Sequence, residues 1–123
     1  MEYQINAIDA YNFQLLLSNG VKIETFRSEE YLGYHLDIPT EKGYYILLKY
    51  LQRVFHRDHV TPIYQADGIW EEELYCFVTE NVLVRYYFDL DTVTVKINAD
   101  TENHRLYDEI IVGFYSSTEY LNY

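Results

Sequence analysis

A chain of 123 residues is long enough for one hydrophobic core, and its net charge of −11 at pH 7 has the wrong sign for binding a phosphate backbone. With 49% hydrophobic residues the chain is too apolar to be disordered, so we expect a single domain over residues 1–123. The start of the chain has no basic segment followed by an apolar one, and no apolar run approaches the length of a membrane span. We therefore expect a cytoplasmic protein.

The first 30 residues predict a β-hairpin. Residues 13–17 and 21–26 are apolar segments joined through Ser18, Asn19 and Gly20, and an Asn-Gly pair supplies the positive φ angles of a tight turn. Residues 3–8 alternate loosely and could add a strand, although a short helix over residues 9–17 competes with the hairpin.

The clearest helix is predicted over residues 41–57. Thr40 can accept a hydrogen bond from a free N–H of the first turn, and Glu41 suits the positive end of the helix dipole. Apolar residues recur at three- and four-residue spacing and form one stripe: Tyr44, Leu47, Leu48, Leu51 and Phe55. Basic residues occupy the rest of the cylinder: Lys42, Lys49, Arg53 and Arg57. The helix is therefore amphipathic, with a basic outer face.

From residue 70 onward the hydrophobic pattern has a period of two. It predicts strands over residues 74–79, 82–88 and 92–98, with a hairpin turn at residues 80–81. Residues 106–115 fit a strand or a helix, and their β-branched and aromatic residues favour a strand. We see no internal repeat. The predicted fold is α+β, with an antiparallel sheet of about five to seven strands packed against one main helix.

No motif of a known catalytic mechanism is present. There is no G-x-S-x-G elbow, P-loop or dinucleotide fingerprint, and the five glycines are scattered rather than clustered in a phosphate-binding loop. The single cysteine, Cys76, lies within a predicted strand, so we expect a buried, unreactive thiol. We expect no catalytic residue and no cofactor.

Two groups of residues could hold a metal ion. His56 and His59 lie on either side of Asp58, and Asp89 and Asp91 form a second pair. The histidines equally suit the negative C-terminal end of the helix, and the aspartates suit a turn between strands. We favour these simpler interpretations and expect no metal site.

The charge and the tyrosines point to a protein partner. Residues 1–60 have a net charge of −2 and residues 61–123 a net charge of −9, which favours a basic protein over nucleic acid or a membrane. The chain contains 15 tyrosines, and tyrosine is favoured at half-solvated interfaces. The candidate contact residues are aromatic anchors and an acidic rim from the acidic half: Trp70, Glu71, Glu72, Glu73, Tyr75, Tyr86, Tyr87, Asp89 and Asp91.

These features favour an acidic inhibitor of the kind represented by bacterial immunity proteins, which would occlude the active site of a basic toxin such as a nuclease. A phage-type decoy that imitates the charge of DNA fits the same features. Two further hypotheses remain open. One is a structural or regulatory subunit that uses the basic helix face to hold an acidic partner or its own second copy, and the other is a metal-dependent enzyme built on the histidine or aspartate groups.

Overall fold

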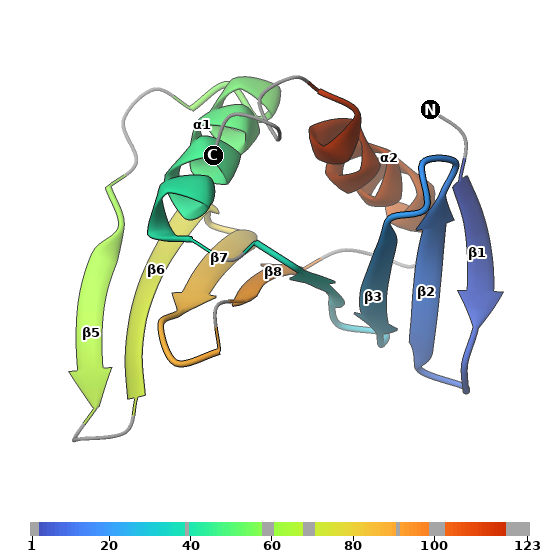
Figure 1. The fold of residues 1–123 in the computed structure, drawn as a ribbon, viewed down its shortest axis with the longest axis horizontal. Helices are drawn as coiled ribbons and strands as arrows, with labels where there is room; N and C mark the ends of the chain where they lie inside the picture. Colours follow the sequence, from blue (N-terminus) through green and yellow to red (C-terminus); the bar gives the residue numbers. More distant parts are fainter. Residues whose placement is uncertain are drawn as a thin grey trace.

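A computed structural model of the chain describes residues 3–38, 40–57, 61–67, 71–90, 92–98 and 103–117. Within these residues eight strands form one antiparallel sheet in the order β1-β2-β3-β4-β8-β7-β6-β5, and two helices lie on the same face of it (Figure 1). The elements are β1 (Tyr3–Ala7), β2 (Asn12–Leu17), β3 (Lys22–Arg27), β4 (Leu32–Leu36), α1 (Glu41–Val54), β5 (Ile63–Asp67), β6 (Glu71–Thr79), β7 (Val82–Tyr87), β8 (Thr92–Ile97) and α2 (His104–Ser116). The α+β class is confirmed, with more strands than predicted.

The chain runs twice through the same succession of four strands and one helix. Strands β1–β4 precede α1, and strands β5–β8 precede α2. The last strands of the two halves, β4 and β8, pair at the centre of the sheet, where Tyr34 is opposite Val95, 61 positions later. The same offset relates the pair Leu15↔Ile23 in the first half to Cys76↔Val84 in the second. The fold therefore repeats about an approximate two-fold axis, although the sequence analysis found no repeat.

The two helices are exchanged between the halves. Helix α1 follows β4 but lies over β6 and β7, where the Tyr44 hydroxyl donates to the Val84 carbonyl at 2.7 Å. Helix α2 follows β8 but lies over the first half, where Asp108 accepts a hydrogen bond from Arg27 of β3. Figure 1 shows α1 above β5–β7 and α2 above β1–β3. Each helix thus covers the strands of the other half.

The hydrophobic core lies between the sheet and the two helices. Alternate strand residues point into it, as Val82, Val84 and Tyr86 do in β7, while their neighbours lie on the other face. Cys76 is buried in β6, as expected, and burial raises the pKa of its thiol to about 11. The face of the sheet opposite the helices, here called the open face, is not covered by any described element.

Helix α1 begins and ends at recognisable caps. The Thr40 hydroxyl accepts the Gly43 N–H at 3.0 Å, as predicted. The helix ends three residues before the predicted end, because His56 adopts a left-handed conformation with φ of 55°. The His56 N–H then donates to the Arg53 carbonyl at 3.3 Å and the Arg57 N–H to the Gln52 carbonyl at 2.8 Å. This is a Schellman motif with histidine where glycine is usual.

Both predicted hairpins are present, and one predicted strand is a helix. Residues 18–20 join β2 to β3, with Gly20 at φ of 89°, and residues 80–81 join β6 to β7. The prediction of a strand over residues 106–115 is wrong, because these residues lie in α2. Asp108, Ile111, Val112 and Tyr115 are buried at helical spacing, so packing of that stripe against the sheet outweighs the β propensity of the segment.

The two helices meet at a close contact. The Tyr50 hydroxyl of α1 donates to the Ile110 carbonyl of α2 at 2.9 Å. A Cβ on Gly113 would lie 2.6 Å from the Tyr50 hydroxyl oxygen, so glycine is what permits this approach.

Candidate functional site

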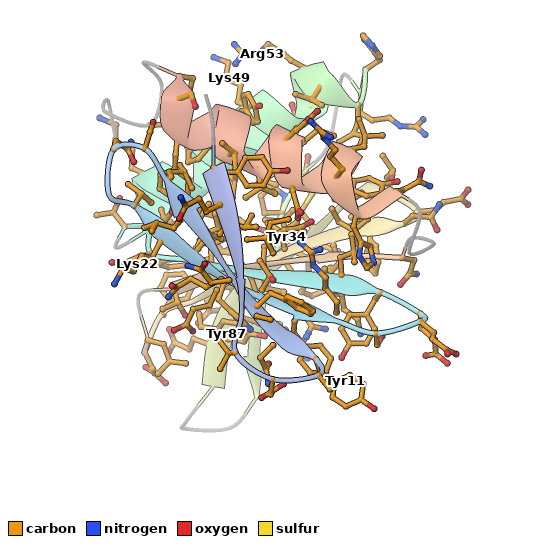
Figure 2. The ribbon with its side chains drawn as sticks, turned by 90° about the vertical axis from the view of Figure 1, so that its right-hand side faces the viewer. Tyr11, Lys22, Tyr34, Lys49, Arg53 and Tyr87 are labelled. Atoms are coloured by element: carbon orange, nitrogen blue, oxygen red, sulfur yellow. The ribbon has the colours of Figure 1, made fainter. Side chains whose placement is uncertain are left out.

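The open face carries a continuous group of apolar side chains on β5, β6 and β7. This open-face patch consists of Ile63, Tyr75, Phe77, Leu83 and Tyr87. Strand pairing makes them neighbours, because Ile63 is opposite Tyr75 and Phe77 is opposite Leu83. Ile63 and Phe77 are 54% and 55% exposed, respectively, and the others are half-buried. Figure 2 shows Tyr87 on the side of the sheet that faces away from α2.

A guanidinium group lies at the centre of the patch. Arg85 is opposite Tyr75 on one side and Thr94 of β8 on the other. Its Nε is buried and has no hydrogen-bond partner among the described residues. Beside it Lys96 lies over the Tyr31 ring, with Nζ 4.3 Å from the ring centroid. The patch therefore combines aromatic surface with a positively charged centre.

Acidic residues lie at one end of the patch. Glu73 is on the open face opposite Tyr87, whereas Glu72 precedes it in β6 and points to the other face, beside Tyr64. The Phe88 N–H donates to the Glu72 carbonyl at 3.1 Å, which brings the exposed Asp89 to the same end. Desolvation and the Glu72 carboxylate raise the pKa of Tyr64, which is opposite Leu74 in the same region. This end of the sheet therefore carries negative charge.

The structure brings together part of the predicted contact set. Tyr75, Tyr87 and Glu73 share the open face, and Asp89 lies at the same end of the sheet, whereas the side chain of Glu72 points to the opposite face beside Tyr64. Trp70 and Asp91 are outside the described residues, as is the side chain of Glu71.

Tyr86 does not belong to the contact surface. It is 3% exposed and packs against Tyr44 of α1, with ring centroids 5.9 Å apart. Successive strand residues point to opposite faces, so Tyr87 can be on the open face only if Tyr86 is in the core. Ile63, Phe77 and Leu83 were not predicted, although Phe77 shares the parity of Tyr75.

The tyrosines are divided between core and surface. Tyr34, Tyr44, Tyr86 and Tyr115 are buried, whereas Tyr11, Tyr45 and Tyr64 are more than 40% exposed. Core packing therefore accounts for only part of the tyrosine content in the described residues.

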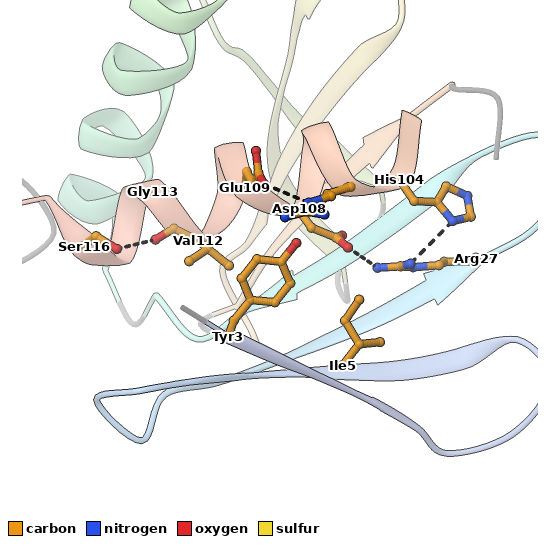
Figure 3. A pocket seen from close by; sticks show the side chains of 10 residues that line it. Tyr3, Ile5, Arg27, His104, Asp108, Glu109, Val112, Gly113 and Ser116 are labelled. Atoms are coloured by element: carbon orange, nitrogen blue, oxygen red, sulfur yellow. Dashed lines mark hydrogen bonds and ion pairs between the residues drawn. The ribbon is translucent and has the colours of Figure 1, made fainter. Parts of the chain in front are cut away.

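A second feature is a groove of about 900 Å³ between β1 and α2 (Figure 3). Tyr3 and Ile5 of β1 point towards α2, and Val112 and Gly113 of α2 lie along the opposite side. At one end, Arg27 donates from Nη2 to Oδ2 of Asp108 at 2.5 Å. The groove thus lies beside a buried ion pair.

The carboxylate of Asp108 is fully buried and paired at both oxygens. Its Oδ1 accepts from the Tyr34 hydroxyl at 2.7 Å, and burial together with this carboxylate raises the pKa of Tyr34 far above its usual value. The Nη1 of Arg27 lies 3.4 Å from Nδ1 of His104, whose pKa is lowered by burial and by Arg27. The group connects α2 to β3 and β4, and its carboxylate is not accessible to a ligand in the groove.

Neither Arg27 nor Asp108 was predicted as a candidate site residue. The available signal was the position of Asp108 in the buried helical stripe with Ile111, Val112 and Tyr115, where a carboxylate needs a partner. No sequence pattern identified Arg27 as that partner.

The described residues contain no group of three or more His, Cys, Asp or Glu side chains able to hold a metal ion. Of the predicted histidine group, Asp58 and His59 lie outside the described residues, and so does Asp91 of the aspartate pair. Among the described helices none is long and apolar enough to cross a membrane. The chain matches no protein-family model, no curated protein and no solved structure.

Proposed function

We propose that this chain is a protein-binding inhibitor of the immunity type, which covers a basic partner with its open-face patch. The observation that carries the proposal is the continuous group of apolar side chains on a sheet face that no described element covers. Exposed apolar surface of this kind marks interaction sites, because a sheet face exposed to water is otherwise polar.

The first half of the chain provides an internal comparison. Sixty-one positions before Tyr75, Phe77, Leu83 and Tyr87 lie Gln14, Leu16, Lys22 and Phe26, on the same face of the equivalent hairpin. Two of the four are polar, so the fold itself does not require an apolar residue at every one of these positions. The apolar side chains of Tyr75 and Leu83 are therefore better explained by binding than by folding.

The charge distribution supports a basic partner. Glu73 and Asp89 lie at one end of the patch, beyond the guanidinium of Arg85 at its centre, and the half of the chain that contains the patch has a net charge of −9. Opposite fields accelerate association, and aromatic and arginine side chains commonly dominate the binding energy at the centre of an interface. A toxin nuclease fits this chemistry, because the surface that holds its substrate phosphates must be basic. In this proposal the chain is not catalytic and acts by occlusion.

The test is affinity capture from the native host with matched surface variants. Phe77→Lys is expected to abolish capture of a basic protein, whereas Leu106→Lys should not, because Leu106 is equally exposed at 54% but lies on α2. If both variants capture the same protein as the unmodified chain, the open-face patch is not the contact surface.

A second pair of variants tests whether electrostatic attraction to a basic partner accelerates association. With the captured protein purified, Glu73→Lys should slow association, and Glu109→Lys, an exposed acidic residue on α2, should have little effect. Binding by the unmodified chain should weaken as salt rises and the screening length falls from about 8 Å to about 3 Å. Binding that is unchanged in high salt would contradict a field-driven contact.

A further inference from the structure

A second charged surface lies on α1, on the opposite side of the molecule from the open-face patch. It is a hollow of about 570 Å³, here called the basic hollow, lined by Lys49, Gln52, Arg53, His56 and Arg57. Figure 2 shows Lys49 and Arg53 beyond the helices and Tyr87 on the far side of the sheet. Binding at one surface would therefore leave the other accessible.

Helical spacing brings the positive charges together. Lys49 and Arg53 are one turn apart, Arg57 follows after a further four residues, and all three are exposed. They contribute a charge of +3 to a chain whose total is −11. No described residue that lines the hollow is acidic. The hollow is therefore a local positive field on an acidic protein.

The capped end of α1 reduces an obstacle to anion binding. The free carbonyl groups of a helix C-terminus carry partial negative charge and would repel an anion. Here the Gln52 and Arg53 carbonyls accept hydrogen bonds from the N–H groups of Arg57 and His56. The left-handed conformation of His56 makes both bonds possible, and it places His56 and Arg57 at the edge of the hollow.

We propose that the basic hollow binds a compact phosphate-bearing anion. Two planar guanidinium groups and a flexible ammonium group are the side chains that best match phosphate oxygens. The volume is within the range of small-molecule sites, roughly 300–1,000 Å³. Without these three basic residues the rest of the chain has a net charge of −14. An extended polyanion such as nucleic acid would reach beyond the hollow and be repelled by this charge, so the ligand must be small.

Titration calorimetry with inorganic pyrophosphate at low ionic strength tests this assignment. Lys49→Glu and Arg57→Glu are each expected to weaken binding about tenfold or more, because each removes a charge-assisted hydrogen bond. Lys42→Glu is the matched control, since Lys42 is exposed on the same helix about 10 Å away along its axis. Circular dichroism establishes that each variant is folded.

Three results would overturn the proposal. The unmodified chain could fail to bind pyrophosphate, Lys42→Glu could weaken binding as much as Lys49→Glu, or a single-stranded oligonucleotide could bind more tightly than pyrophosphate. Phe77→Lys should leave pyrophosphate binding unchanged, so this test does not depend on the proposed inhibitor function.

Discussion

Replacing Asp108 with alanine is expected to destabilise the protein more than any surface substitution. The change leaves the Arg27 guanidinium, whose side chain is 10% exposed, without its anion, and it leaves the fully buried Tyr34 hydroxyl without its acceptor. Breaking a buried ion pair by removing one partner costs roughly 3–5 kcal/mol. Since a domain is stable by only about 5–15 kcal/mol, the loss of about 4 kcal/mol is a large fraction of the total.

Urea unfolding followed by circular dichroism measures the loss. With an m value of about 2 kcal/mol/M, a loss of about 4 kcal/mol lowers the urea midpoint by about 2 M. Glu109→Ala is the control, because its ion pair with Arg105 is exposed at both side chains and should contribute less than about 1 kcal/mol.

A further variant separates the charge from the packing. Arg27→Met combined with Asp108→Leu removes both charges and fills similar volume, so it should recover much of the lost stability. If Asp108→Ala is no more destabilising than Glu109→Ala, the buried pair does not stabilise the attachment of α2. If the double variant is as unstable as Asp108→Ala, the unpaired charge is not the cause.

Three further substitutions test other contacts, each by urea unfolding. His56→Gly should stabilise the protein by about 1 kcal/mol, because glycine adopts the left-handed conformation without strain; an unchanged midpoint would contradict this. Gly113→Ala should destabilise it despite the higher helix propensity of alanine, because the new Cβ meets the Tyr50 hydroxyl; a rise in stability would show that Tyr50 moves away easily. Because the pKa of His104 is lowered in the folded state, the unfolded state binds its proton first, so stability should fall as pH drops below about 6.5. His104→Gln should reduce this pH dependence of stability, and an unaltered pH profile would show that another group causes it.

The elements that were predicted correctly are those whose geometry is set by a few residues adjacent in sequence. Asn19 and Gly20 identified the first hairpin, because Gly20 supplies the positive φ of the turn and the Asn19 side chain accepts the Val21 N–H, and Thr40 identified the start of α1 because its cap is made within one turn. Helix α2 was the less favoured of two alternatives for its segment, because the segment is β-branched and aromatic and its helical form depends on packing over strands far away in sequence. The ion pair joins residues 27 and 108, which no local pattern relates.

The candidate contact surface was predicted only in part, because local alternation shows which residues share a strand face but not which face is covered. Alternation along β6 placed Tyr75 on the face opposite the core, and alternation along β7 required one of Tyr86 and Tyr87 to project outward; the structure has Tyr75 and Tyr87 on that face. Phe77 and Leu83 were overlooked because an apolar residue in a strand is ordinarily assigned to the core. Which strand face is covered depends on where the helices pack, and that information is in the tertiary structure.

The exchange of helices between the halves has a consequence for how such a chain could arise and fold. A single unit of four strands and a helix would leave its own sheet uncovered, because its helix packs on the strands of the other unit. Two separate copies that exchanged helices would form the same sheet with the same two helices on one face. The chain therefore has the organisation expected of a swapped homodimer whose subunits became joined end to end. Each strand pairs with a strand adjacent to it in sequence, except at the β4–β8 pair that joins the two halves. The core can therefore be completed only after this long-range pair has formed.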